Sequence, residues 1–254
     1  MIWIDKGGGP VALEAIQQNI TTEHRLDFEA SPATYMAGTD KFDFPEDYKI
    51  QEVVDTLRAR QYNKCCFSEA YFTADYPHVE HFRPKGAVDA YPTGPRQFPG
   101  YFWLAYKWEN LYLCKAQINT SFKRSFFPLA DGSIRNRSHL DNNVEQPLIV
   151  HPGEPNPRNH IRFHEDEPYG ISERGTVTVR LLGLRQSLLE EVRRTKLKVL
   201  KEMKQAVDDG LAEGMDVNHR VLARLITVLR SATEPSAEFS SMAIDMLSGW
   251  PPLA

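Results

Sequence analysis

The sequence predicts an α+β protein, with short strands in the middle of the chain and helices towards both ends. Apolar residues recur at helical spacing in residues 45–57 and again after residue 187, whereas residues 67–82 and 111–113 have the character of extended segments. The length of 254 residues is enough for one large domain or two small ones.

Composition narrows the class of protein. Apolar residues make up 41% and charged residues 25%, as in ordinary globular proteins, and the net charge is -4. A nucleic-acid enzyme with this balance needs a local basic patch or a partner that supplies affinity. No apolar run approaches the roughly 20 residues of a membrane span, and the first residues lack the pattern of a secretory leader. Three cysteines do not form a disulfide framework, so we expect a cytoplasmic protein without membrane contact.

The first sixty residues predict an arm and two helices. Residues 1–4 are expected to be a short strand or arm, and Pro10 to open a short helix that ends near Asn19. Residues 20–44 show no clear period, so we expect an irregular segment that covers other parts or contacts a partner. Residues 45–57 combine an acidic first turn with apolar helical spacing and predict a helix.

The middle of the chain predicts strands, a loop and a helix. Residues 67–82 are expected to form a hairpin or strand pair, and the Gly- and Pro-rich residues 86–100 an exposed loop. The aromatic residues within 101–108 are expected in the core, with stacking on nucleic-acid bases as the alternative. Residues 111–113 predict a strand and residues 115–125 a helix.

The last hundred residues predict a few strands and then helices. Residues 147–152 are expected to form a strand, and residues 161–163 to pair with residues 176–180. Three helices should follow, at residues 187–210, 218–231 and 235–247. The charged face of the first of these is expected to be solvated, with docking of a partner as the alternative.

A carboxylate and two histidines form the candidate reaction centre. Glu80 directly precedes His81, and His78 lies two residues earlier. Successive side chains of an extended segment face opposite sides, so Glu80 and His81 cannot do the same job. A carboxylate suits a hard divalent cation, and an imidazole suits a proton acceptor. We therefore expect Glu80 to bind a metal and His81 to act as general base, with His78 either a further ligand or a neighbour that only packs nearby.

Further polar residues extend this centre. On a helix, Asn119 and Lys123 would share one face and could meet a metal and a phosphate. Arg83, Lys85, Lys123 and Arg124 are candidates for a rim that binds phosphate, since lysine offers a point charge and arginine a fork of donors. The alternative for each basic residue is a solvated surface.

Four segments together resemble a known family. They are Glu-His-Phe-Arg-Pro-Lys at 80–85, Trp-Leu-Ala-Tyr-Lys-Trp-Glu-Asn-Leu at 103–111, Asn119-x3-Lys123, and Phe-Pro-Leu at 127–129. In this order they resemble the HNH endonuclease superfamily, in particular the retron- and Septu-associated anti-phage nucleases of the PtuB type. The first segment is specific, whereas the spaced Asn and Lys alone would be a weak signal.

The resemblance implies a fold and several roles. It implies a ββα-metal nuclease core at residues 61–135, an N-terminal arm with helices at 1–60, and a mainly helical region at 136–254 that packs on the core and docks a partner. It casts Asn110 as an amide that braces the loop carrying His81. It casts Asn119 as a metal ligand and Lys123 as a phosphate contact, beside Glu80 and His81 as catalytic residues.

The cysteines depart from the family pattern. Relatives often carry two Cys-x2-Cys knuckles that bind a structural zinc, but here the matching positions are Cys65 with Ser68 and Cys114 with Gln117. Serine and glutamine are poor substitutes for thiolates at zinc, so we expect no stable zinc.

The resemblance also implies a function. It implies a nuclease that uses one Mg²⁺ or Mn²⁺ ion to hydrolyse phosphodiester bonds, with DNA favoured as substrate. It further implies an effector of anti-phage defence that works with an ABC/SMC-type, PtuA-like ATPase and in some systems a retron. The alternatives are a nuclease that cuts RNA such as tRNA, and a non-catalytic adaptor with a decayed site. The missing zinc ligands favour the adaptor, and the intact polar residues of the site oppose it.

Overall fold

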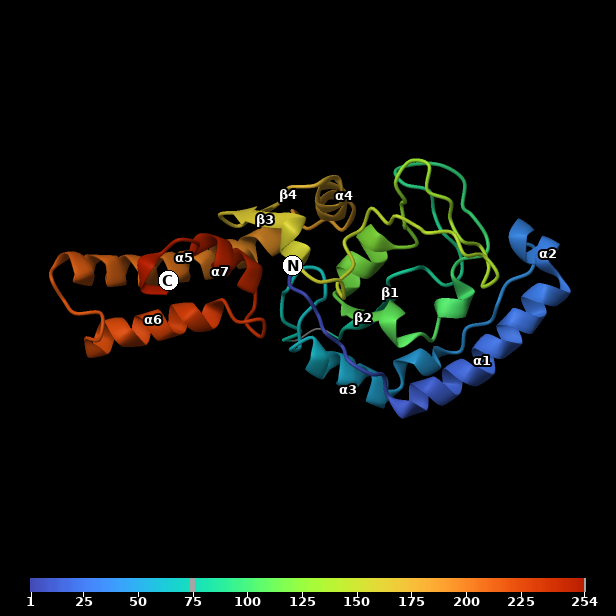
Figure 1. The fold of residues 1–254 in the computed structure, drawn as a ribbon, viewed down its shortest axis with the longest axis horizontal. Coiled ribbons are helices and arrows are strands. Elements are labelled where there is room, and N and C mark those ends of the chain that lie inside the picture. Colours follow the sequence, from blue (N-terminus) through green and yellow to red (C-terminus); the bar gives the residue numbers. More distant parts are fainter. Residues whose placement is uncertain (74–75, 254) are drawn as a thin grey trace.

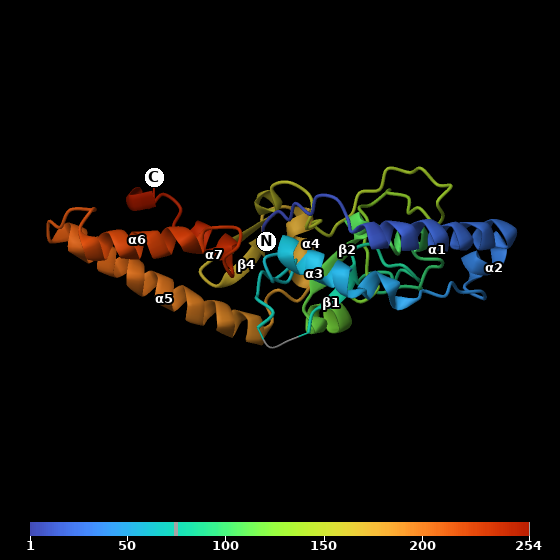
Figure 2. The same ribbon diagram turned by 90° about the horizontal axis from the view of Figure 1, so that it is seen from below.

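A computed structural model describes residues 1–73 and 76–253 of the chain. The architecture is α+β, and the strands of the described residues form two antiparallel pairs. Figures 1 and 2 show an elongated molecule in which the long C-terminal helices α5 and α6 extend at one end and α1 and α2 lie at the other. The strand pair β1–β2 lies between these ends, among α3 and the loops that follow it.

The N-terminal helices are longer than the sequence predicted. Helix α1 spans Val11–Ala30 and is followed by α2 (Pro32–Ala37), so the expectation of an irregular segment at 20–44 was wrong for most of it. Two of the residues that α1 buries, Thr21 and His24, are polar, and this hides the helical period. The His24 ring fits the buried face because its Nε2 donates to the Asp43 carbonyl oxygen at 2.7 Å.

The helix predicted at 45–57 is divided in two. A 3₁₀ turn, η1 (Glu46–Lys49), precedes α3 (Gln51–Arg60), and Ile50 between them is extended, with ψ of 150°. Helix α3 buries Val53 and Leu57 completely, as the apolar spacing predicted.

The central strand pair joins segments far apart in the sequence. Strand β1 (His78–His81) pairs with β2 (Leu111–Cys114), with Glu80 opposite Tyr112. A hairpin within residues 67–82 was therefore the wrong expectation for the described residues, and the part of it at 74–75 lies outside them. Every residue of β2 is buried, and so are most of the aromatic residues at 101–108, which belong to the core as predicted.

Short helical turns lead into and out of this strand pair. The turns η2 (Phe102–Leu104) and η3 (Trp108–Asn110) precede β2, and the π-helical segment η4 (Ile118–Lys123) follows it. In η4 the Arg124 amide donates to the Asn119 carbonyl oxygen at 2.8 Å, five residues back, so the turn is wider than in the α-helix expected there. Such π turns occur frequently at functional sites.

The second strand pair is a local hairpin. Strand β3 (Ile161–His164), which follows the turn η5 (Pro157–Asn159), pairs with β4 (Glu167–Gly170). Residues 176–180 do not pair with β3 as expected, because they belong to helix α4 (Glu173–Leu181). The Ser172 hydroxyl caps this helix by accepting from the Gly175 amide at 3.1 Å, and this cap outweighs the strand preference of the Thr-Val-Thr-Val run.

The C-terminal helices form a lobe with its own small core. Helix α5 (Ser187–Ala212) packs against α6 (Arg220–Ala232), which in turn contacts α7 (Ser240–Met246) and the turn η6 (Pro251–Leu253). These are close to the three helices predicted, although the last begins five residues later than expected. No helix of the described part of the chain is long and apolar enough to cross a membrane.

The strand expected at 147–152 is absent from the described residues, and residues 1–4 take the second of the two forms expected for them, an arm. These two segments instead run side by side as extended arms, and the Ile4 amide donates to the Pro152 carbonyl oxygen at 2.9 Å. The Val150 amide is satisfied by the Thr178 hydroxyl of α4 at 2.8 Å. The arms therefore connect the region of β1–β2 to α4 without forming a sheet.

Candidate functional site

A groove of about 830 Å³ runs beside β1 and collects most of the predicted site residues. Its lining includes His78, Glu80 and His81 of β1 together with Asn119 of η4. The opposite wall comes from residues 41–58, which carry η1 and α3 and which the sequence analysis did not connect with the site. The groove is therefore assembled from three segments that are distant in the sequence.

His81 is held in one tautomer. Its Nε2 lies 2.8 Å from the Ala105 carbonyl oxygen, and because that oxygen can only accept, Nε2 carries the proton. Burial, and next the nearby Lys85 ammonium, lower the pKa of His81 to about 3. The ring is thus neutral, and Nδ1 keeps an unprotonated lone pair. The Tyr48 ring packs edge-on against the imidazole, with ring centroids 4.7 Å apart, and fixes its plane.

Asn110 joins the chain after His81 to the turn that contains Ala105. Its Oδ1 accepts from the Arg83 amide at 2.7 Å, and its Nδ2 donates to the carbonyl oxygens of Arg83 at 3.1 Å and Leu104 at 3.0 Å. These three hydrogen bonds position both the segment that carries His81 and the carbonyl group that binds its Nε2. This is the bracing placement that the family resemblance implied for Asn110.

Glu80 forms a buried ion pair with Lys123. Glu80 Oε1 lies 3.0 Å from Lys123 Nζ, and the side chains are 5% and 0% exposed. Burial raises the pKa of Glu80, and the ammonium of Lys123 opposes that rise. Within residues 1–73 and 76–253, Oε1 has this ion pair but no aligned hydrogen-bond donor. Lys123 therefore lies behind Glu80, whereas the sequence analysis expected it to face a phosphate.

The oxygen donors of the groove fit a hard cation with few protein ligands. Glu80 offers an oxygen without an aligned donor, and Asn119, half-buried on η4, lines the same groove. Residues 1–73 and 76–253 contain no cluster of three His, Cys, Asp or Glu side chains that could hold a metal. Mg²⁺ is commonly held by one or two carboxylates, with waters and substrate phosphates completing its shell, so this donor set is adequate. His78 is exposed at the end of β1 and lines the groove beside Glu80.

The lining of the groove is basic. Glu80 is the one carboxylate in its described lining, against six cationic side chains, Lys41, Lys49, Arg58, Lys85, Arg96 and Arg124. Two of these cations are paired with carboxylates outside the lining, Lys49 with Glu46 and Arg96 with Asp89. The Lys85 ammonium lies 3.9 Å from the centre of the Tyr48 ring, and burial lowers its pKa to about 8. Of the predicted rim, Lys85 and Arg124 line the groove. The sequence analysis missed the other four cations, because residues 41–58 and Arg96 reach the site only through the tertiary fold.

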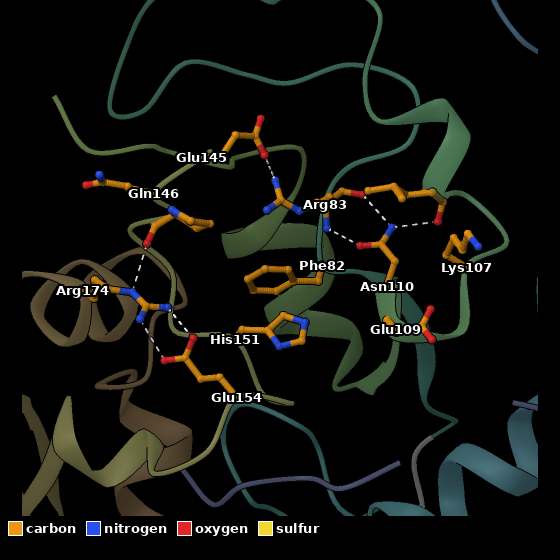
Figure 3. A pocket seen from close by; sticks show the side chains of 12 residues that line it. Phe82, Arg83, Lys107, Glu109, Asn110, Glu145, Gln146, His151, Glu154 and Arg174 are labelled. Carbon is orange, nitrogen blue, oxygen red and sulfur yellow. Dashed lines mark hydrogen bonds and ion pairs between the residues drawn. The ribbon is translucent and has the colours of Figure 1, made fainter. Parts of the chain in front are cut away.

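Arg83 lies elsewhere, in a pocket next to Asn110 (Figure 3). Its guanidinium forms an ion pair with the nearly buried Glu145, and it lies over the ring of Phe127 at 4.8 Å. In the same pocket Glu154 binds Arg174 through two hydrogen bonds of 2.9 and 2.7 Å. The two arginines of this pocket are thus neutralised by carboxylates, and Arg83 is not directed into the groove.

The positions of the zinc knuckles still converge in part. The Sγ atoms of Cys65 and Cys114 are 3.9 Å apart, and Ser68 is buried beside them. Burial raises the pKa of the Cys65 thiol, but hydrogen bonds from Cys114, Cys66 and Ser68 outweigh it, so this pKa lies well below its usual value. Gln117 is exposed. Hydrogen bonds among Cys65, Cys66, Cys114 and Ser68 thus link three of these positions, and the expectation of no stable zinc stays a prediction.

The chain is similar to the Septu protein PtuB of Bacillus mycoides (strain KBAB4). The two are 29% identical over 222 residues, which cover 84% of this chain and 72% of the relative. No family model matches the chain, and no solved structure matches it. The similarity extends over most of both chains, and we conclude that the protein is a homologue of this Septu protein.

Proposed function

We propose that the protein is a metal-dependent HNH endonuclease that hydrolyses phosphodiester bonds of nucleic acid, with DNA favoured, as an effector of anti-phage defence. The observation that carries the proposal is the groove in which a tautomer-locked His81 lies next to the Glu80 carboxylate among six cationic side chains. The similarity to a Septu protein supports the defence role.

His81 would act as the general base. Its Nδ1 lone pair accepts a proton from a water molecule in the groove, and the resulting imidazolium keeps its Nε2 hydrogen bond to Ala105. A pKa of about 3 makes a weak base, so the base must strengthen when substrate binds. The like charge of Lys85 contributes to this low value, and a phosphate anion paired with Lys85 would remove that contribution.

Phosphate would be held by the basic wall of the groove. Lys85 and Arg124 line it close to Glu80 and His81, and Arg124 offers a fork of donors from an exposed position. Glu80 and Asn119 would hold a Mg²⁺ or Mn²⁺ ion, which supplies charge stabilisation for the scissile phosphate and the leaving oxygen. Lys123 pairs with the buried Glu80 and opposes the rise that burial causes in its pKa, which is a positioning role.

The proposal is tested by His81→Ala with His164→Ala as the matched control. His164 is exposed at the end of β3 and lies outside the groove. Removal of a general base should lower the cleavage rate by about 10² to 10⁴, while the control should retain the wild-type rate. Near-normal cleavage by a folded His81→Ala protein would refute the proposed mechanism.

The substrate and the partner are part of the same proposal. Plasmid DNA and tRNA should be digested with and without Mg²⁺, since a hydrolytic site of this kind does not need a 2′-hydroxyl. Cleavage of tRNA alone would identify an RNA nuclease, and no cleavage of either substrate even with the ATPase partner added would identify an adaptor. We further propose an ATPase of the ABC/SMC type as the partner, with α5 as the docking face, because its polar side is exposed and highly charged.

A further inference from the structure

A second hollow of about 630 Å³ adjoins the groove. Arg96 and Phe98 line both, so the two cavities are neighbours that share part of one wall. The far side of the hollow carries Arg135 and Arg137, which follow the loop after η4. Neither arginine was a candidate in the sequence, because nothing in the local pattern connects residues 135–137 to β1.

Both arginines are fixed in place without being neutralised. Arg137 donates from Nε to the Phe98 carbonyl oxygen at 2.9 Å and from one terminal nitrogen to the Met36 carbonyl oxygen at 3.0 Å. Arg135 donates to the Gln97 side-chain oxygen at 2.9 Å and to the Pro99 carbonyl oxygen at 3.0 Å. Carbonyl oxygens orient a guanidinium but leave its full positive charge. In residues 1–73 and 76–253 neither arginine forms an ion pair.

One nitrogen of Arg135 has no acceptor. Its second terminal nitrogen is enclosed and forms no hydrogen bond within the described chain. A buried donor without a partner costs about 1 to 3 kcal/mol, so an oxygen ligand at this position would be favoured. The carboxylates near Arg135 are already engaged, since Glu145 pairs with Arg83 and Asp141 accepts from the amides of Arg137 and Ser138.

We propose that Arg135 and Arg137 form a second phosphate-binding site. This site binds a backbone phosphate of the same nucleic acid at a distance from the phosphate that lies at Glu80 and His81. The proposal rests on the proposed nuclease function and gives its substrate a minimum length. Two guanidiniums that are held in place and that no carboxylate of the described residues neutralises attract a phosphate through their positive charge. A substrate that spans both sites runs from the groove past Arg96 and Phe98 into the hollow.

The test compares substrate lengths in a double variant, Arg135→Gln with Arg137→Gln. Binding is measured by fluorescence anisotropy over a salt series without divalent metal, with duplexes of about 6 and about 24 base pairs. Each lost phosphate contact should reduce the slope of log K against log salt by about 0.9, so we expect a reduction of about 1 to 2 for the long duplex and none for the short one. The matched control, Arg220→Gln with Arg224→Gln on the exposed face of α6, should leave both slopes unchanged.

A second variant covers the case in which the arginine substitutions disturb folding. Ile134 lines the hollow and is 66% exposed, so Ile134→Glu keeps both arginines and adds a competing carboxylate. It should weaken binding of the long duplex about tenfold and leave binding of the short duplex unaffected. Unchanged binding of the long duplex in both variants would overturn the proposal, as would failure of the wild type to bind it at low salt. Because no cleavage is measured, an inactive His81 would not change these outcomes.

Discussion

The Asn110 amide offers a quantitative test of how the site is held together. In Asn110→Asp the shape of the side chain is retained, and one carboxylate oxygen can still accept from the Arg83 amide. The other oxygen would replace Nδ2, which lies 3.1 Å from the Arg83 carbonyl oxygen and 3.0 Å from that of Leu104. Two carbonyl acceptors would then face a carboxylate oxygen, and both would lose their donor.

The expected cost follows from counting these groups. Each buried acceptor left without a donor costs about 1 to 3 kcal/mol, so with two such acceptors Asn110→Asp should lower the free energy of unfolding by about 2 to 6 kcal/mol at pH 7. Asn110→Ala should cost less, because it removes the hydrogen bonds without adding a buried charge. The Asp variant should recover part of its stability at acid pH, where a protonated carboxyl can donate one hydrogen bond.

The measurement is urea unfolding at pH 7 and pH 5, with Asn119→Asp as the control. Asn119 is half-buried at the groove, so its conversion should change the free energy of unfolding by less than about 0.5 kcal/mol. If Asn110→Asp is as stable as the wild type at pH 7, the bracing role of the amide is refuted. A loss of stability in Asn119→Asp equal to that in Asn110→Asp would show that the effect is general to added charge.

Three further predictions concern zinc, pH and the partner. The purified protein should contain well under one zinc per chain and should stay folded with a chelator, whereas stoichiometric zinc on Cys65 and Cys114 with unfolding on chelation would contradict this. Burial lowers the pKa of His151 to about 4, so its contribution to stability is complete above pH 6.5 and declines as the pH falls towards 4. When the pH falls from 7 to 5, the free energy of unfolding measured by denaturant titration should therefore decrease by about 2 kcal/mol less in His151→Gln than in the wild type. The control is His164→Gln, at an exposed histidine, and its free energy of unfolding should follow that of the wild type. The isolated chain should bind DNA weakly at physiological salt and gain activity with an ATPase partner; nanomolar binding and full-rate cleavage by the chain alone would exclude partner dependence.

The elements that the sequence predicted best are those whose burial follows one period. Helix α5 was predicted almost to its ends because its apolar residues are spaced regularly over many turns. Helix α1 was predicted too short because Thr21 and His24 are polar residues on its buried face. Helix α4 was misread as a strand because its β-branched run suits both structures, and the Ser172 cap decides between them.

The candidate site could be predicted from the sequence where residues adjacent in the sequence form it. Glu80 and His81 are adjacent, and the register of β1 with β2 places Leu111 opposite His81, which brings Asn110 close to the same loop. Lys123 was placed wrongly, since an α-helical spacing put it beside Asn119 and gave no sign that it turns towards the buried Glu80. The π-helical form of η4 and its position against β1 depend on tertiary packing, so the local sequence pattern does not predict them.

The charge of the groove shows why the net charge of the whole protein is a poor guide to nucleic-acid binding. The net charge of -4 argued for weak binding, yet the described lining of the groove has six cations and one carboxylate. Lysine and arginine from α3, from the loop after β1 and from the residue after η4 converge there, and only two of the six cations, Lys49 and Arg96, are paired with a neighbouring carboxylate in the described residues. A polyanion responds to the local potential within about 10 Å at 0.1 M salt, so the groove attracts it while more distant acidic surfaces are screened. At low ionic strength this screening weakens, and the acidic remainder of the molecule opposes the approach more strongly. The salt series thus separates attraction by the groove from repulsion by the acidic surfaces. If the groove dominates, the affinity for nucleic acid still increases at low salt. If long-range repulsion is strong, the affinity changes little as the salt concentration is lowered.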